Sequence, residues 1–449
     1  MKDMIRIGNG QGFWGDSIDA PVRLAKDGPL DYLTLDYLAE VTMSIMQRQK
    51  LKNPNAGYAR DFPDLVKRIL PEIQDKGLKV ITNAGGVNPT ACRNKLLELA
   101  KSSRKEIKIG VIQGDDIFPK LQELRNLGVA FDNMDTGESF DKVAYQVYSA
   151  NVYINSSTIS EALGKEAQIV LAGRVSDPGL ALGPCIYEFN WNESDYNLLA
   201  AGTLAGHITE CGAQCTGGNY SRWQDVPDLA DIGYPIIEMR SDGIFCITKH
   251  KGSGGLVNRE TIGEQVLYEM GDPENYISPD VCVDFTSFAL KDLGDNRVEI
   301  DNVKGFTPTD TYKVSISYFA GYKAAGQLTI SGPNAYEKAQ LTAEIIWKRL
   351  TNAGAQFEDT STEYLGLSSC HGEINPIPDQ LNEVVLRLGV RDMDKDKVNR
   401  FGKEIAPVIT NGPPGITGFS GGRPKAQEIV AYWPTLIPKE LVQSTVDVI

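Results

Sequence analysis

The densest set of chemically capable side chains lies in the stretch GHITECGAQC, residues 206–215. His207, Cys211 and Cys215 are spaced four residues apart, so a continuous helix would place them on one face. One imidazole and two thiolates can hold Zn²⁺ and leave a coordination position open. Without a metal, His207 can activate Cys211 as a thiolate, or Glu210 can act as a general base. Cysteines that merely fill a helix rich in small residues are the alternative without chemistry.

We predict that this segment works without a metal. The glycines after Cys211 disfavour a helix that reaches Cys215. Without that helix, the imidazole and the two thiolates do not converge as a zinc site requires. We therefore assign His207, Glu210 and Cys211 to catalysis. A carboxylate within reach of His207 would raise the pKa of its imidazole and keep it useful as a proton carrier. The chain has three histidines in total, so few other groups transfer protons near neutral pH.

The glycine-rich stretch GNGQGFWGDS, residues 8–17, raises the question of a bound dinucleotide. It follows a short apolar strand candidate and contains the Gly-x-Gly-x-x-Gly spacing of a pyrophosphate-binding turn. Such a turn needs an unbroken helix, but Pro21 falls nine residues after Gly12, where proline would break it. We predict that no continuous helix runs from Gly12 through Pro21, although Asp36 stands close to the ribose-binding position of the fingerprint.

We instead interpret this loop as part of an active site. Asp16 is assigned to catalysis, and Gly12 and Trp14 are assigned to substrate binding. A glycine lets the backbone approach a ligand, and an aromatic ring can pack on it. The structural alternative is that Trp14 covers the edge of the sheet and Asp16 caps a turn.

Polar and glycine-rich turns also follow three of the strand candidates. TNAGGVNP begins at residue 82, QGDD at residue 113 and AGRVSDPG at residue 172. Exposed backbone N–H groups in such turns suit an anion or an oxyanion, and an Arg beside an Asp suits an anion clamp or a structural ion pair. Asp177 is assigned to catalysis. The substrate-binding residues expected in these turns are Asn83, Gly85, Gly86, Asp115 and Arg174.

A further anion-binding candidate is TKHKGSGG, residues 248–255. Lys249 and Lys251 precede a glycine run that includes Gly254 and Gly255, and glycines beside lysines can cradle phosphate groups. The spacing is not that of a nucleotide-binding P-loop. We assign these four residues to substrate binding, with a plain hairpin turn as the alternative.

The elements that must position these residues alternate between strand and helix in the first half of the chain. Short continuous apolar runs predict buried strands at residues 4–8, 31–36, 78–82, 107–112 and 168–173. Amphipathic patterns between them predict helices at residues 62–76, 90–101 and 117–127. This is an α/β pattern with a mainly parallel, doubly wound sheet. Since the carboxyl ends of parallel strands share one edge, we expect a single cleft there. The side chains expected around it are Asp16, Asn83, Asp115, Arg174 and Asp177.

The pattern changes after about residue 236. Segments such as GIFCITKHKGSGG and TYKVSISYFAG alternate apolar with polar residues, which predicts antiparallel strands. Residues 334–354 predict one amphipathic helix closed by Gly354. We therefore predict two domains, an α/β domain over residues 1–230 that carries the site and an α+β domain over residues 231–449.

Composition narrows the possible partners. The 449 residues carry a formal net charge of −14, which disfavours binding to the nucleic-acid backbone. No apolar run is long enough to span a bilayer, and the first residues lack the order of a signal peptide. Seven scattered cysteines, an odd number, indicate reduced thiols. We expect a cytoplasmic protein that binds a small molecule, no nucleic acid and no membrane.

Six stretches, in this order along the chain, resemble the acyclic terpene utilisation (AtuA) family. They are GFWGDS at 12–17, TNAGGVNP at 82–89, LAGRVSD at 171–177, GHITECGAQCTGGN at 206–219, QVLYEMGDPENYISPDV at 265–281 and SGGRP at 420–424. Longer members carry an extra C-terminal ferredoxin-like domain, and this chain stops just after WPTLIPKELV. The resemblance therefore implies that this domain is absent or is supplied by a small partner chain.

The resemblance implies a role in the breakdown of terpenes through branched acyl-CoA intermediates. We expect a catabolic enzyme of the lyase or hydratase type that acts on a branched acyl-CoA or related carboxylate, works as a homo-oligomer and uses no cofactor beyond CoA as part of the substrate. Two alternatives are a nicotinamide-dependent oxidoreductase, which needs a true pyrophosphate turn, and a non-catalytic subunit of a degradation complex.

Overall fold

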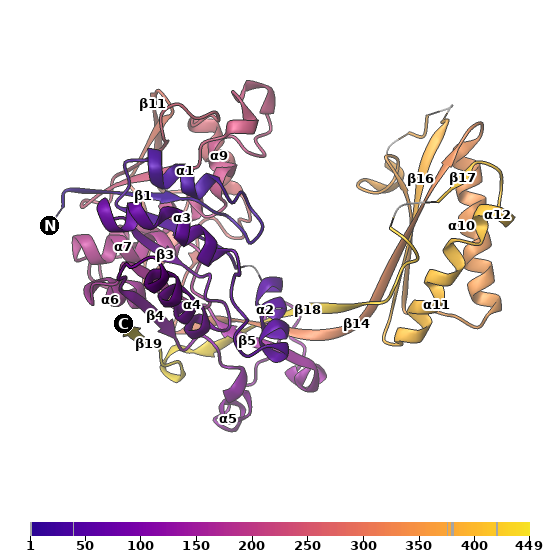
Figure 1. Cartoon of the computed structure of the whole chain (residues 1–449), viewed down its shortest axis with the longest axis horizontal. Helices are drawn as coiled ribbons and strands as arrows, with labels where there is room; N and C mark the ends of the chain where they lie inside the picture. Colours follow the sequence, from indigo (N-terminus) through magenta and orange to yellow (C-terminus); the bar gives the residue numbers. More distant parts are fainter. Residues whose placement is uncertain (1, 39, 375, 379–380, 419–420) are drawn as a thin grey trace. The chain divides into compact units, whose positions relative to one another are not determined.

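The computed structural model describes residues 2–38, 40–374, 376–378, 381–418 and 421–449. The chain forms two compact units. The first comprises Met1–Ser317 together with Tyr432–Ile449, and the second comprises Tyr318–Ala431 (Figure 1). Each unit has its own sheet and its own helices.

The first unit is built on a ten-stranded sheet with the order β11-β12-β8-β7-β1-β2-β3-β6-β4-β19. Strands β1, β2, β3, β6 and β4 pair in parallel at its centre, and the remaining strands pair antiparallel on either side. The bounds are β1 Met4–Asn9, β2 Tyr32–Leu35, β3 Lys79–Thr82, β4 Ile109–Gln113, β6 Ile169–Leu171, β7 Pro235–Arg240, β8 Phe245–Lys249, β11 Ala289–Gly294, β12 Arg297–Asp301 and β19 Thr445–Val448. The α/β class and the five strands predicted in the first half of the chain are confirmed.

The central strands are mostly apolar and buried because helices cover both faces of the sheet. One hydrophobic core joins residues of the central strands to α1 (Ala20–Asp27), α3 (Phe62–Asp75) and α4 (Pro89–Ser102). Helices α6 (Ser157–Gly164), α7 (Gly179–Phe189) and α8 (Tyr196–Thr209) contribute nothing to that core and pack in sequence against one another and the sheet. Leu33, Val80 and Val170 are fully buried as a result.

The other elements of the first unit surround this layered centre. Strands β13, β10 and β9 form a small antiparallel sheet, and β5 pairs with β14. Their bounds are β5 Val147–Val152, β9 Tyr276–Ile277, β10 Cys282–Asp284 and β13 Lys304–Phe306, and the further helices are α2 Glu40–Lys52, α5 Leu121–Asn126 and α9 Arg259–Leu267.

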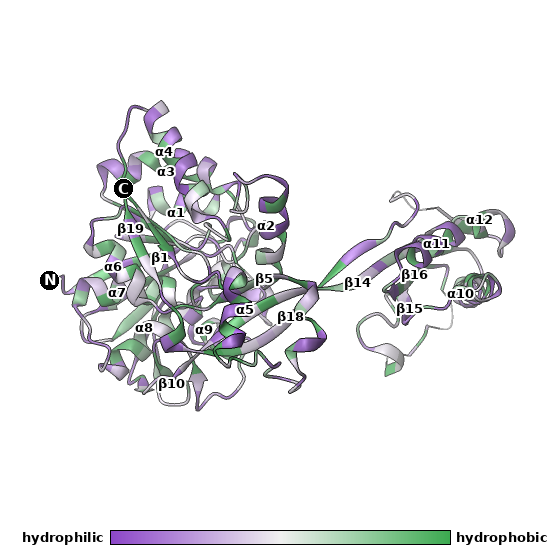
Figure 2. Ribbon diagram, turned by 90° about the horizontal axis from the view of Figure 1, so that it is seen from below, coloured by the Kyte–Doolittle hydropathy of each residue, from purple (hydrophilic) through white to green (hydrophobic). Residues whose placement is uncertain are grey.

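The second unit is an antiparallel sheet with helices. Its sheet has the order β15-β16-β14-β17, and β18 also pairs with β14. The bounds are β14 Thr311–Ser331, β15 Asp359–Leu365, β16 Glu383–Asp392, β17 Ile416–Thr417 and β18 Gln427–Pro438, with helices α10 Ala335–Asn352, α11 Lys395–Ile405 and α12 Val408–Asn411. The helices bury one face of the sheet in a single core. They carry both hydrophilic and hydrophobic residues, as amphipathic helices on a sheet should (Figure 2).

The division of the chain differs from the boundary expected near residue 230. Residues 231–317 belong to the first unit because β7 pairs with β1, β8 pairs with β7, and β12 pairs with β8. These alternating strands add to the edge of the parallel sheet and do not form a separate domain. The second unit is an insertion of residues 318–431, and the chain returns to the first unit for its last strands.

Gly206 in α8 should tolerate no side chain. A Cβ at this position would lie 2.4 Å from the carbonyl oxygen and 2.6 Å from the Cα of Pro178, which are rigid backbone atoms. We expect Gly206→Ala to lower the free energy of unfolding by about 1–3 kcal/mol, measured by urea denaturation. The matched control is Gly263→Ala in α9, where no atom lies within 4 Å and the substitution should be neutral or stabilising by up to about 1 kcal/mol. Equal effects of the two substitutions would contradict this packing.

Candidate functional site

A cavity of about 460 Å³ lies within the first unit, beside the carboxyl end of β6. Its wall combines side chains that carry protons with aromatic and apolar ones. The charged and titratable residues in the wall are Asp135, Tyr153, Asp177, His207, Glu210, Glu269, Tyr276, Tyr312, Lys313 and Tyr432. The turn between β6 and α7 supplies Asp177, the last turn of α8 supplies His207, and the residue after that turn supplies Glu210.

His207 and Glu210 form a buried pair. The His207 side chain is 2% exposed, and its Nδ1 lies 3.2 Å from Oε1 of Glu210. The other ring nitrogen, Nε2, lies 3.3 Å from the carbonyl oxygen of Val266, to which it can donate. Nε2 can therefore donate to Val266, whereas Nδ1 faces Glu210 at ion-pair distance without the geometry of a hydrogen bond. Burial alone would lower the pKa of His207, but the interaction with Glu210 outweighs it and raises the pKa above the ordinary 6.5.

Aromatic rings close the space around this pair. The His207 ring lies 5.4 Å from that of Tyr276 and 5.2 Å from that of Phe285, and the latter two rings stack at 4.7 Å. Burial raises the pKa of Tyr276 well above its ordinary value. The Tyr276 hydroxyl therefore remains protonated and can act as a hydrogen-bond donor at the cavity wall.

Asp177 is held by a buried arginine. The Arg174 side chain is 2% exposed, and its Nη1 lies 3.1 Å from Oδ1 of Asp177. The same Nη1 donates to the carbonyl oxygen of Leu38 at 2.7 Å, and the guanidinium lies 4.3 Å from the ring centre of Tyr153. These contacts fix Arg174 as the support that orients the more exposed Asp177 at the cavity wall.

Two further carboxyl groups lie buried around Arg174. Asp115 accepts hydrogen bonds from the Arg174 amide at 2.7 Å and from Asn151 at 3.0 Å. Asp36 accepts one from Asn83 at 2.7 Å. Burial raises the pKa of Asp36 to about 6 and that of Asp115 to about 7, although the charge of Arg174 favours the ionised form of Asp36. Neither carboxyl group lines the cavity.

The structure brings some of the residues singled out in the sequence together. Asp177, His207 and Glu210 line the same cavity. Arg174 contacts Asp177 directly, and Asp115 is linked to it only through the Arg174 amide. Asn83 belongs to the same cluster through Asp36, and its side-chain oxygen accepts the Tyr37 amide at 2.7 Å. Gly85 and Gly86 lie in the turn that follows and do not line the cavity.

Cys211 and Cys215 lie outside helix α8, which ends at Thr209. Cys215 is buried in the following 3₁₀ turn, Gly212–Thr216. Burial, reinforced by the charge of Glu210, raises the pKa of Cys211 to about 12, which disfavours the thiolate that the nucleophile reading requires. Among the residues described, no group of three His, Cys, Asp or Glu side chains could hold a metal ion.

No continuous helix runs from Gly12 through Pro21. Helix α1 begins only at Ala20, with Asp19 at its N-cap, so the prediction of a broken helix is confirmed. A Cβ at Gly12 would lie 2.7 Å from the backbone carbonyl carbon of Cys211, so glycine is needed here for close packing.

The side chains of this loop make structural contacts. Asp16 accepts hydrogen bonds from the Gly12 amide at 3.0 Å, from the Ser17 amide at 2.6 Å and from the Tyr234 hydroxyl. The Trp14 indole donates to Asp61 at 2.9 Å. None of Gly12, Trp14 and Asp16 lines the cavity, and the contacts of Asp16 are those of a residue that caps a turn.

The lysines and glycines at 249–255 also lie away from the cavity wall. Lys249 ends β8 and donates to the carbonyl oxygen of Ser253 at 2.8 Å. Gly254 pairs with Ile232, and Gly255 has a φ of +89°, so the segment is a tight turn packed on the 227–233 loop. Lys251 is exposed.

Several wall residues carried no sequence signal of their own. Glu269, Tyr276 and Ser278 lie in the stretch QVLYEMGDPENYISPDV, which contributed to the family resemblance but suggested no chemistry. Lys313 comes from β14, and the other residues from that strand and from β18 are Thr311, Tyr312, Tyr432, Pro434 and Leu436. Long-range pairing of strands brings them together, which spacing along the chain cannot reveal.

The fold and cavity define an α/β protein with a cavity of mixed polar and apolar lining beside the carboxyl end of a parallel strand. The family model for the acyclic terpene utilisation family protein AtuA matches residues 5–448, and the chain belongs to that family. Neither a curated protein nor a solved structure matches it. In the part of the chain that the structure describes, no helix is long and apolar enough to cross a membrane.

The pair of His207 and Glu210 should be visible in a titration. We expect the NMR resonances of His207 to titrate above pH 6.5, and those of His250, whose pKa is lowered by burial, to titrate below it. Glu210→Gln should lower the pKa of His207 because it removes the carboxylate that favours the imidazolium. Glu269→Gln, which removes a more weakly acting charge, should lower it less.

The same pair should make stability depend on pH. Because the folded-state pKa of His207 lies above its unfolded value, the stabilisation is complete below about pH 6.5 and is lost as the pH rises through the folded-state pKa. Denaturation of the unmodified protein and of Glu210→Gln at a series of pH values should therefore show a gap that narrows toward alkaline pH. A gap that widens instead would rule out the assigned pairing.

Proposed function

We propose that the chain is an enzyme of the lyase or hydratase type that acts on a branched acyl thioester or related carboxylate. One observation carries this proposal: a carboxylate, Asp177, and an imidazole with a raised pKa, His207, face the same cavity. Dehydration of a 3-hydroxyacyl group needs a base to remove the proton next to the carbonyl and an acid to protonate the departing hydroxyl group. Asp177 is suited to the first role, and the pair of His207 and Glu210, both of which line the cavity, is suited to the second.

The cavity wall suits a branched hydrocarbon. Its volume of about 460 Å³ falls within the range of small-molecule sites. Aromatic and apolar side chains occupy much of the wall, so methyl branches could be buried there. These residues are Met134, Tyr153, Pro178, Tyr276, Ile277, Pro279, Tyr312, Tyr432, Pro434 and Leu436. The Lys313 ammonium at the wall could attract a carboxylate or polarise a thioester carbonyl.

The two alternatives have less support. A nicotinamide-dependent oxidoreductase needs a pyrophosphate site, and the loop after β1 lacks the helix that would supply one. A titration that follows the fluorescence of a reduced nicotinamide cofactor should therefore show no saturable change. The alternative of a non-catalytic subunit does not account for two proton carriers in one cavity. Measuring the activity of the isolated chain distinguishes this alternative from an enzyme.

Turnover is tested with the purified full chain and a panel of branched 2-enoyl and 3-hydroxyacyl thioesters, since gain or loss of the conjugated double bond changes the ultraviolet absorbance. We expect Asp177→Asn and His207→Gln each to lower kcat by about 100-fold or more. The control is Lys251→Ala, an exposed residue outside the wall, which should keep full activity. Absence of turnover with every thioester, in a protein that is folded by circular dichroism, would favour the non-catalytic subunit.

A further inference from the structure

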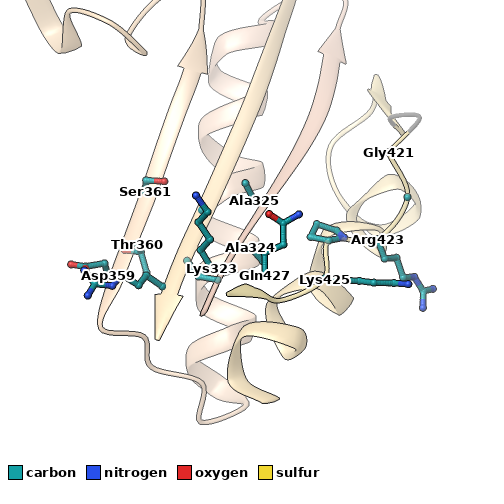
Figure 3. A pocket seen from close by; sticks show the side chains of 15 residues that line it. Lys323, Ala324, Ala325, Asp359, Thr360, Ser361, Gly421, Arg423, Lys425 and Gln427 are labelled. Atoms are coloured by element: carbon teal, nitrogen blue, oxygen red, sulfur yellow. The ribbon is translucent and has the colours of Figure 1, made fainter. Parts of the chain in front are cut away.

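A second cavity, of about 840 Å³, lies in the second unit. Figure 3 shows it between the strand that bears Asp359, Thr360 and Ser361 and the loop that bears Arg423 and Lys425, with Lys323 between them. The floor is the face of the sheet that the helices leave uncovered, since Lys323 is exposed whereas its neighbour Ala324 belongs to the core beneath α10 and α11. We call this cavity the sheet groove.

The sheet groove is lined by more positive than negative side chains, although the chain as a whole is acidic. Four cationic side chains line it, Lys323, Arg391, Arg423 and Lys425, against one carboxylate, Asp359. The chain as a whole has a formal net charge of −14, whereas the second unit holds 12 Lys and Arg against 13 Asp and Glu. The four cations are therefore gathered in one place and do not reflect a generally basic surface.

Two of these cations face each other without a counter-charge between them. In the antiparallel pairing of β14 and β16, Lys323 lies directly opposite Arg391 on the open face of the sheet. Like charges in this position disfavour the sheet. Asp359 lies opposite Arg391 on its other side, at 3.4 Å from Nη1. Within the described residues, neither Lys323, Arg423 nor Lys425 forms an ion pair with a carboxylate.

The loop that supplies Arg423 and Lys425 is fixed to helix α11. A Cβ at Gly402 would lie 2.0 Å from the carbonyl oxygen of Pro424, so the loop packs directly on the helix backbone there. The Ala426 amide also donates to the Asn399 side chain at 3.0 Å. These contacts hold the loop backbone on one side of the groove, which lowers the entropy that ordering a ligand site would cost.

Small residues make the space for a ligand. Ala325, Gly389 and Ser361 lie side by side on the three neighbouring strands, in line across the floor. Hydroxyl groups of Thr360 and Ser361 and the amide of Gln427 are available as neutral hydrogen-bond partners at the wall. A hollow with small residues at its centre and cations on two sides fits a compact ligand with more than one negative charge.

We propose that the sheet groove binds a phosphate-bearing small molecule through Lys323, Arg391, Arg423 and Lys425. Arginine and lysine hydrogen bonds to phosphate oxygens are charge-assisted, and the anion would relieve the repulsion between Lys323 and Arg391. The site is separate from the cavity of the first unit, and the inference does not depend on the reaction proposed there.

The test is calorimetric titration of the full chain with inorganic phosphate, inorganic diphosphate and ADP, at low and at high salt. We expect saturable binding that weakens with salt. Lys323→Ala with Arg423→Ala should weaken it by about ten-fold or more. The matched control is Lys348→Ala with Lys403→Ala, which removes two exposed lysines from α10 and α11 and should change the affinity by less than about two-fold.

The three probes distinguish the source of the phosphate. Equal affinity for inorganic diphosphate and ADP assigns the groove to a bare phosphate group, and tighter binding of ADP assigns it to a phosphorylated nucleoside. Failure of all three to bind, or equal losses in the two double variants, would overturn the proposal. So would a change in oligomeric state on removal of Lys323 and Arg423 without any phosphate binding, which would assign the groove to contact with an acidic surface of a second copy.

Discussion

The burial of the Arg174 guanidinium is the constraint on which the candidate site depends. Removing such a charge from water costs several kcal/mol unless partners compensate it. Arg174 follows the central strand β6 and finds those partners in three different segments, the Leu38 carbonyl, the Asp177 carboxylate and the face of Tyr153. Because the arginine cannot leave this position without losing them, it also fixes where Asp177 stands at the cavity wall.

The buried carboxyl groups of Asp115 and Asp36 lie near Arg174. Asp115 accepts the Arg174 amide, and Asp36 is held by Asn83, so polar groups at the strand ends satisfy one another away from water. Burial raises the pKa of both carboxyl groups, which favours their protonated forms, whereas the charge of Arg174 favours the ionised form of Asp36.

The sequence contained enough information for the central layers of the fold. Strands buried on both faces must be continuously apolar, and the runs at residues 31–36 and 168–173 reveal β2 and β6 for that reason. The domain boundary could not be found in the same way. The alternating pattern of β7 and β8 is the same whether the strands found a new sheet or extend an old one, and only the long-range pairing of β7 with β1 decides it.

The candidate site, like the fold, could be predicted from the sequence only where the contacts are local. His207 and Glu210 are three residues apart, so local helical geometry was sufficient to pair them. Asp16 also follows a buried strand, as Asp177 does, but its carboxylate caps backbone amides and bonds Tyr234. Position after a strand shows which edge of the sheet a residue occupies. It does not show whether its side chain faces a cavity or its own backbone.

The connection between the two units explains why the cavity wall draws on such distant segments. The second unit begins within β14, at Tyr318, and ends within β18, at Ala431, and these two strands pair with each other. Lys313 and Tyr312 lie near the start of β14, and Pro434 and Leu436 lie near the end of β18, so the two strands supply wall residues where the chain leaves the first unit and where it returns. Because β14 and β18 pair with each other, the two ends of the inserted unit lie side by side. The pairing of β14 with β18 therefore brings wall residues together from two segments that are far apart along the chain.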